Sequence, residues 1–82
     1  MIGNIVQSKA GRDKGRNYIV IKAEKEFIFL ADGDVRKLDN LKRKKPKHIT
    51  VTGKAEILVE KLTAGRIIYD AEIKKYLRGN NV

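Results

Sequence analysis

The chain has 82 residues, no cysteine, and nineteen Lys and Arg against ten Asp and Glu, which gives a formal net charge of +9. A chain this short forms one domain with a modest core, and the lack of cysteine excludes disulfides, thiolate metal sites and a thiol nucleophile. No signal peptide opens the sequence and no apolar run approaches the roughly 20 residues that a membrane span needs, so we expect a cytoplasmic protein. The basic excess favours nucleic acid over an anionic membrane as the partner. Thirteen of the nineteen basic residues lie within residues 1–52, so the binding surface is expected there.

Apolar and β-branched runs predict strands at residues 3–8, 17–23 and 27–30. The second of these is apolar at four consecutive positions, Tyr18 to Ile21, which favours a strand that is covered on both faces. Phe27 and Phe29 belong to the third run and are expected in the core.

Between the first two strands lies a basic segment with two glycines, residues 9–16, which we call the glycine turn. Glycine allows positive φ and close backbone approach, and arginine offers a planar fork of donors suited to phosphate or guanine edges. Tyr18, beside the turn, is the one aromatic residue considered for base stacking. The candidate RNA contacts here are Lys9, Gly11, Arg12, Lys14, Gly15, Arg16 and Tyr18. An ordinary turn with solvated charges is the alternative interpretation.

Asp32-Gly33 predicts a two-residue hairpin loop that leads into a fourth strand at residues 35–38. Residues 40–47 are polar and contain Pro46, which excludes a helix interior, so a basic loop is expected before a fifth strand at residues 48–52. Candidate phosphate contacts from this part are Arg36, Lys37, Lys42, Arg43, Lys44, Lys45, Lys47 and His48. Short strands at this spacing indicate a small closed or half-closed antiparallel barrel over residues 1–52.

Residues 53–82 predict a helical extension that packs on the barrel or projects from it. Apolar residues at helical spacing, from Ala55 to Leu62, predict a first helix with Thr52 as its cap and Gly65 as its stop; a strand over residues 56–59 is the competing interpretation. A second helix is expected from Asp70 to Gly79, and residues 80–82 are expected to fray. The apolar stripe of this second helix is formed by Ile73, Tyr76 and Leu77.

Nothing in the sequence predicts a catalytic residue, a metal site or a cofactor. His48 is the only histidine, and no carboxylate spacing completes a metal site around it. Asp32 and Asp34 are not expected to be a catalytic pair, because both flank a turn and aspartate is common in turns. The glycine turn matches neither a dinucleotide fingerprint nor a P-loop, because the further glycine and the Gly-Lys-Ser/Thr ending are missing. We therefore expect a protein that is not an enzyme.

Residues 2–52 resemble a known family. The matching runs are, in chain order, Gly3-x-Ile5-Val6, Ala10-Gly11-Arg12-Asp13-Lys14-Gly15-Arg16, Tyr18-Ile19-Val20-Ile21, Phe27-x-Phe29-Leu30-x-Asp32-Gly33 and Lys47-His48-Ile49. They resemble the KOW motif, and the longer pattern looks like the KOW-domain proteins of the archaeal and eukaryotic large ribosomal subunit and their small bacterial relatives. The resemblance implies a mainly β, SH3-like barrel of about five strands that binds ribosomal RNA. The helical extension departs from it.

Carried onto this chain, the resemblance implies that Gly11, Arg12, Gly15 and Arg16 form the contact turn, with Lys47 and His48 as the basic approach to the last strand. The leading hypothesis is a non-enzymatic RNA-binding protein, ribosome-associated and monomeric when free. KOW domains of transcription elongation factors contact RNA or protein. The alternative hypothesis is a protein-interaction adaptor of the transcription or translation machinery that uses the barrel and the C-terminal helix. Its motivation is the apolar stripe Ile73, Tyr76 and Leu77 in a part of low net charge.

Overall fold

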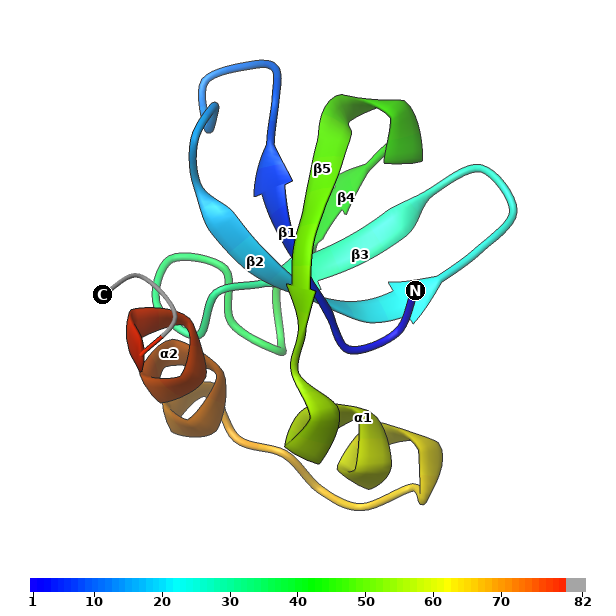
Figure 1. Cartoon of the computed structure of the whole chain (residues 1–82), viewed down its shortest axis with the longest axis vertical. Helices are drawn as coiled ribbons and strands as arrows, with labels where there is room; N and C mark the ends of the chain where they lie inside the picture. The colour runs from blue at the N-terminus through cyan, green and yellow to red at the C-terminus, as the bar shows by residue number, and fades with distance from the viewer. Residues whose placement is uncertain (80–82) are drawn as a thin grey trace.

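The computed structural model describes residues 1–79. Its five strands form one antiparallel sheet in the order β4-β3-β2-β1-β5, followed by two helices (Figure 1). The elements are β1 (Asn4–Ser8), β2 (Asn17–Ala23), β3 (Ile28–Ala31), β4 (Lys42–Lys44), a 3₁₀ turn (Pro46–His48), β5 (Ile49–Lys54), α1 (Glu56–Thr63) and α2 (Asp70–Gly79). The sheet is open, because β4 and β5 lie at its two ends and are not hydrogen-bonded neighbours. The structure is thus a small, mainly β domain.

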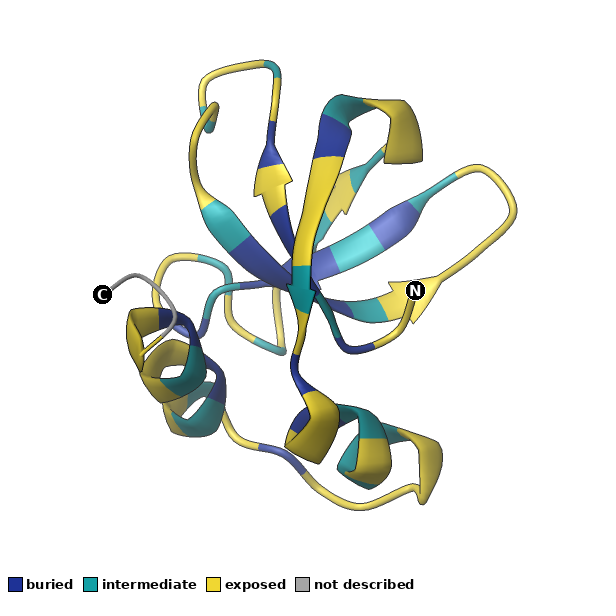
Figure 2. Cartoon of the chain, viewed as in Figure 1, coloured by how far each residue is buried: buried dark blue, intermediate teal, exposed yellow. Residues whose placement is uncertain are grey.

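Two apolar clusters lie on the two faces of the sheet, as the four consecutive apolar residues of β2 predicted. Tyr18 and Val20 point into one cluster and Ile19 points into the other, because successive strand residues face opposite sides. The first, which we call the inner cluster, consists of Val6, Tyr18, Val20, Ile28, Leu30 and Ile49. The second, the helix-side cluster, consists of Ile5, Ile19, Ala31, Ala55, Leu58, Ile68, Ile73 and Leu77. Burial is concentrated in the middle of the sheet, and the connecting turns are exposed (Figure 2).

The sheet is strongly twisted, and the strands diverge in direction (Figure 1). The pairing register shifts between Ile5 and Val6 against β5, and between Val20 and Lys22 against β3. Such bulges bend a strand and increase its twist. They allow five short strands to curl around the inner cluster.

Phe27 and Phe29 were expected in the core, and that prediction is wrong. Both side chains are partly exposed and belong to neither cluster, while Ile28 and Leu30 take the inner positions. The apolar run was continuous, so its alternation did not indicate which side chains point inward.

The predicted hairpin and fourth strand at residues 35–38 are also wrong. Asp32 holds a turn instead, since its Oδ1 accepts the backbone N–H groups of Asp34 (2.9 Å) and Arg36 (2.8 Å). This segment, residues 32–40, docks on α2, where Asp70 Oδ1 accepts the backbone N–H of Leu38 at 2.7 Å. The fourth strand lies later, at Lys42–Lys44, inside the segment that was expected to be a loop.

Both predicted helices are present, and the competing strand over residues 56–59 is wrong. Gly65 follows α1 with φ +70°, as its predicted role as a stop requires. Thr52 is not the cap of α1, because it lies in β5 and donates to the carbonyl of Ile5 at 3.3 Å. The Asp70 side chain accepts the backbone N–H of Leu38 instead of capping its own helix.

The helices pack on the sheet, where Ile73 is fully buried and Leu77 is 6% exposed. They are also joined to each other by an ion pair between Lys61 of α1 and Glu72 of α2. Glu72 accepts the backbone N–H of Tyr69 as well, at 3.0 Å, and the hydrogen bond from Lys61 is the main reason that the pKa of Glu72 is lowered.

The expected fraying of residues 80–82 lies outside the described residues. Within residues 1–79, neither helix has the length and apolar character to cross a membrane.

Candidate nucleic-acid interface

The glycine turn is a compact loop at the end of the sheet that lies away from the helices (Figure 1). Gly11 and Gly15 have φ of +86° and +91°, which lies in the left-handed region that favours glycine. The ends of the turn are tied by backbone hydrogen bonds from Gly15 N–H to the Ser8 carbonyl and from Ser8 N–H to the Arg16 carbonyl, both 2.9 Å. A Cβ added at Gly15 would meet nothing within 4 Å, so conformation rather than internal space requires this glycine.

One carboxylate, that of Asp13, organises the turn from inside. Its Oδ1 accepts hydrogen bonds from Ser8 Oγ (2.9 Å) and Lys44 Nζ (2.8 Å), and its Oδ2 accepts one from the Tyr18 hydroxyl (2.9 Å). Lys44 Nζ also donates to the Ala10 carbonyl at 3.0 Å. We call Ser8, Asp13, Tyr18 and Lys44 the Asp13 cluster. It joins the turn to β1, β2 and β4.

The electrostatics of this cluster keep Asp13 charged and Tyr18 protonated. Burial by itself raises the pKa of Asp13, but the hydrogen bonds from Lys44, Tyr18 and Ser8 outweigh burial and lower the pKa to about 2. Burial and the hydrogen bond to Asp13 both raise the pKa of Tyr18. At neutral pH the turn therefore contains one carboxylate with three donors committed to it.

Two predicted RNA contacts turn out to be parts of this internal support. The Tyr18 side chain is 1% exposed, so the base-stacking role considered for it is wrong: no ring face is available to a base. The Lys44 side chain is 10% exposed and its ammonium is paired with Asp13, so it is not available as a phosphate contact. Both residues shape the surface from beneath.

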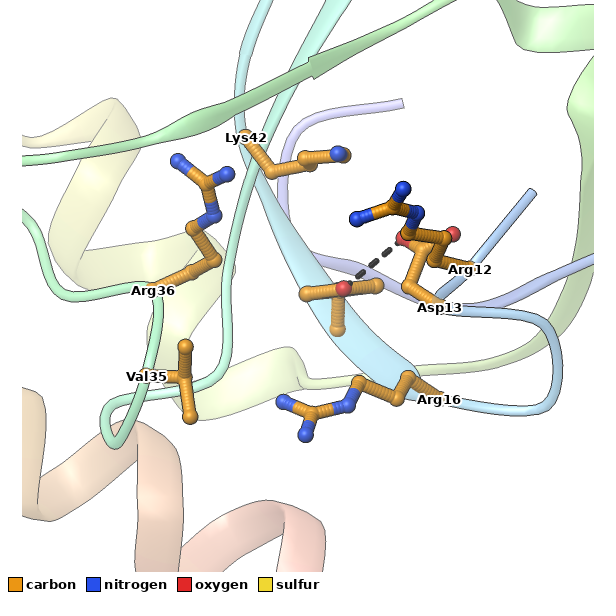
Figure 3. Close-up of a pocket in the computed structure, with 7 residues that line it drawn as sticks. Arg12, Asp13, Arg16, Val35, Arg36 and Lys42 are labelled. Carbon is orange, nitrogen blue, oxygen red and sulfur yellow. Dashed lines mark hydrogen bonds between the residues drawn. The ribbon is translucent and has the colours of Figure 1, made fainter.

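Above the Asp13 cluster is a hollow of about 230 Å³ whose walls are mostly cationic (Figure 3). Its four basic residues come from three separate segments: Arg12 and Arg16 from the glycine turn, Arg36 from residues 32–40, and Lys42 from β4. Figure 3 shows Arg36 and Lys42 on one side of the hollow, facing Arg12 and Arg16 on the other. Val35 and Tyr18 also line it, and Asp13 is its one acidic lining residue. We call it the four-cation hollow.

The positive charge of this hollow is only partly balanced. Arg16 lies 3.5 Å from a carboxylate oxygen of Asp32, and Arg36 Nη1 lies 3.5 Å from the amide oxygen of Asn40. Among residues 1–79, no acidic group forms an ion pair with Arg12 or Lys42. Four like charges around one hollow favour an anion there, and arginine forks suit a phosphate.

The other predicted basic residues lie outside the lining of the four-cation hollow. Lys9 and Lys14 are exposed on the glycine turn, and Lys37 is exposed on residues 32–40. All three are close in sequence to residues that line the four-cation hollow. Lys45 and Lys47 line a separate, shallow hollow with Glu26 and Pro46. His48 is partly buried, and its carbonyl accepts the backbone N–H of Lys9 at 2.8 Å, which ties the glycine turn to the basic segment.

Arg43 points to the face of the sheet opposite the hollow, where its guanidinium carbon lies 4.6 Å from the centre of the Phe27 ring.

Sequence reasoning missed the organising role of Asp13 and Ser8, and predicted Asp32 only as a turn residue. The one signal that marked Asp13 was its position as the single acid inside a run of basic residues. Within the described chain, no group of three His, Asp or Glu side chains could hold a metal ion.

The sequence matches none of the protein-family models against which it was scanned, and a search of curated proteins gave no significant match. The KOW resemblance therefore remains a prediction.

Proposed function

We propose that this protein is a non-enzymatic RNA-binding protein that grips the phosphates of structured RNA, ribosomal RNA in the leading case. One observation carries the proposal: four cations from three chain segments surround one hollow, and two of them have no acidic partner among the described residues. The net charge of +9 supports a polyanionic partner.

The proposal includes a fold of KOW type, an SH3-like barrel, and the five-stranded antiparallel sheet, which is open between β4 and β5, is the observation that supports it. Five short antiparallel strands, two bulges and an inner cluster are what such a curled sheet requires. The glycine turn follows its first strand, where the family resemblance puts the contact element.

Binding of this kind relies on charge and shape. Arg12, Arg16 and Arg36 offer guanidinium forks that take a phosphate through two parallel hydrogen bonds, and the rigid turn sets their spacing. Each phosphate that is neutralised releases counterions, so affinity falls steeply as salt rises. Phosphate contacts position an RNA without reading its sequence.

The adaptor hypothesis loses the observation that motivated it. The stripe Ile73, Tyr76 and Leu77 faces the sheet, with Ile73 fully buried and Leu77 6% exposed, so it is occupied within the chain itself.

The test is a salt titration of RNA affinity with the double variant Arg12→Ala/Arg16→Ala, using a ribosomal RNA hairpin. We expect weaker binding and a salt slope that falls by about 0.7–0.9 for each phosphate that the variant no longer neutralises. The matched control is Arg66→Ala/Lys75→Ala, which removes the same charge from exposed positions on the helical side.

Equal losses of affinity in the two variants would mean that only net charge matters, and would contradict the role of the hollow. The ribosomal part of the proposal has its own test, which is co-sedimentation with ribosomal subunits as salt is raised. If the natural chain leaves the ribosomal subunits at the same salt concentration as the Arg12→Ala/Arg16→Ala variant, that part of the proposal is contradicted.

A further inference from the structure

A second surface of the chain has the chemistry of a nucleobase site, on the side of the sheet opposite the inner cluster. Phe27 and Phe29 are the only phenylalanines of the chain, and both are partly exposed. Each ring has a cation over one of its two faces: Lys22 Nζ lies 5.4 Å from the Phe29 ring centre, and the Arg43 guanidinium carbon lies 4.6 Å from the Phe27 ring centre. We call Lys22, Phe27, Phe29 and Arg43 the aromatic row.

The pairing of the strands lines these side chains up. Phe29 of β3 is the register partner of Lys22 in β2 and of Arg43 in β4, so the three residues run straight across three strands. Directly opposed residues of an antiparallel pair share a face of the sheet. These three residues therefore form a cation–ring–cation line set by the backbone, and Phe27 joins the row through its contact with Arg43.

The helices leave this line uncovered. Ala31 lies two residues beyond Phe29 on the same face and is buried in the helix-side cluster. The partly buried residues that pack on that cluster are Ile21, Leu38, Leu41, Leu62 and Tyr76, and neither phenylalanine is among them. The row thus lies past the end of the helix cover.

We propose that the aromatic row binds unpaired bases of an RNA strand, by stacking on the phenylalanine rings and on the outer plane of the Arg43 guanidinium. Bases of single-stranded RNA stack on aromatic rings and on arginine planes, and every base offers a π face, so the contact tolerates sequence variation. The inference rests on the proposal that the chain binds RNA, and adds base contacts to a grip that otherwise reads only phosphates.

The charge of the row favours RNA over an apolar protein partner. An apolar surface that docked here would have to strip water from Lys22 and Arg43 without pairing their charges, which is costly. A nucleotide provides an aromatic base for the rings and a phosphate for the cations. Lys22 has one weak, exposed acidic neighbour, Glu24 at 3.8 Å, and Arg43 has no ion pair with any acidic group of residues 1–79.

The row and the four-cation hollow are linked through one edge strand. Lys42 lines the hollow and Arg43, the next residue, covers Phe27, because consecutive strand side chains point to opposite faces. β4 is the last strand at this side of the sheet, so an RNA strand held at the hollow can pass over its edge to the row.

The test uses the full chain with ¹³C-labelled phenylalanine, whose two rings give two sets of NMR signals. The probes are an oligouridylate of about ten nucleotides, which is within the size of one small binding site, and an abasic ribose-phosphate oligomer of the same length. We expect both phenylalanine rings to shift upfield with oligouridylate and not with the abasic oligomer. Backbone signals of Gly11, Arg12 and Gly15 should move with both.

Variants supply an independent measurement. Phe29→Leu and Phe27→Leu keep an apolar side chain and remove the ring, and each should weaken oligouridylate binding by about fivefold to a hundredfold while leaving the abasic oligomer unaffected. Arg43→Lys keeps the positive charge and loses the guanidinium plane, so it should also weaken oligouridylate binding. The control is Tyr69→Leu, at an exposed aromatic residue just before α2, which should change neither affinity.

The outcomes separate this inference from the function on which it rests. Phenylalanine signals that stay still while the glycine-turn signals move would overturn the row and leave the phosphate grip intact. Equal shifts with the abasic oligomer, or with oligoglutamate, would also overturn it, by assigning the row to phosphates or to acidic peptides. If neither set of signals moves with either RNA probe, the proposed function fails together with the row.

Discussion

At the scale of single residues, Asp13 decides the shape of the cationic surface. Three donors from three strands converge on its carboxylate. Without Asp13, the buried Tyr18 hydroxyl would lose its hydrogen-bond acceptor, and the nearly buried Lys44 ammonium would keep only the Ala10 carbonyl and lose its counter-charge. A carboxylate beneath a ring of cations also lowers their mutual repulsion. The acid in the basic turn therefore supports the cations structurally and electrostatically.

We predict that Asp13→Asn lowers the free energy of unfolding by about 2–4 kcal/mol, because it leaves the Lys44 ammonium buried without a counter-charge. Urea unfolding followed by circular dichroism measures this loss. The control is Asp39→Asn, at an exposed position, which should stay within about 0.5 kcal/mol of the natural chain.

The same variant gives a pH test with a definite sign. The pKa of Asp13 is lowered to about 2 in the folded chain, against about 3.9 in an unfolded one, so its contribution is complete above roughly pH 5 and is lost as pH falls towards 2. The gap in unfolding free energy between the natural chain and Asp13→Asn should therefore narrow over that range, by an amount on the order of 2 kcal/mol. A gap that is constant with pH would show that the charge of Asp13 is not what stabilises the turn.

At the scale of elements, the segment of residues 32–40 carries Arg36 to the four-cation hollow because it is docked on α2. Gly33 makes that docking close: a Cβ added there would lie 2.2 Å from the Asp70 carbonyl oxygen and 2.8 Å from the Lys74 nitrogen. Both of these neighbours are backbone atoms, which cannot rotate away as a side chain would. The position of Arg36 is thus set by α2, an element that contributes no residue to the hollow.

We predict that Gly33→Ala costs about 1–3 kcal/mol more in unfolding free energy than Gly65→Ala, since overpacking adds to the strain of positive φ. Gly65 is the matched control, with φ +70° against +77° at Gly33 and nothing within 4 Å of an added Cβ. Thermal unfolding of both variants measures the difference. Equal losses of stability would mean that the close approach to α2 relaxes freely.

Elements with their own periodicity could be predicted from the sequence, and elements defined by their partners could not. The bounds of β2 and the presence of α1 and α2 followed from apolar spacing. β4 could not be predicted, because Lys42–Lys44 has no apolar alternation and becomes a strand only by pairing with β3 at an edge, where charge is tolerated.

The candidate site divides in the same way. Arg12, Arg16, Arg36 and Lys42 could each be predicted as RNA contacts from charge and turn chemistry. Their grouping around one hollow could not, since it depends on the Asp32 turn and on the pairing of β3 with β4. The exposure of Phe29 could not be predicted either, because only the register shows which residues of a continuous apolar run face outward.

At the scale of the whole molecule, the helices are the cover of one sheet face and not an independent arm. Ile68, Ile73 and Leu77 pack with Ile5 and Ile19 of the sheet in one cluster, so removal of the helical part would expose the strands on that face. A two-sided sheet needs both of its apolar faces covered to be stable.

We predict that a chain ending at Gly65 loses its cooperative unfolding transition and the dispersion of its amide NMR signals. The control is a chain ending at Gly79, which keeps every residue of the helix-side cluster. A folded, RNA-binding chain ending at Gly65 would contradict this, and would show that residues 66–79 form a separate arm.

The edge position of β4 has a consequence for self-association. One side of this strand pairs with β3, and the other offers backbone donors and acceptors to which another chain could add a strand. A second copy pairing there in antiparallel fashion would set the cations Lys42 and Arg43 against those of its twin. The side chains that we propose as RNA contacts therefore also repel a second copy, and this repulsion weakens as salt screens it.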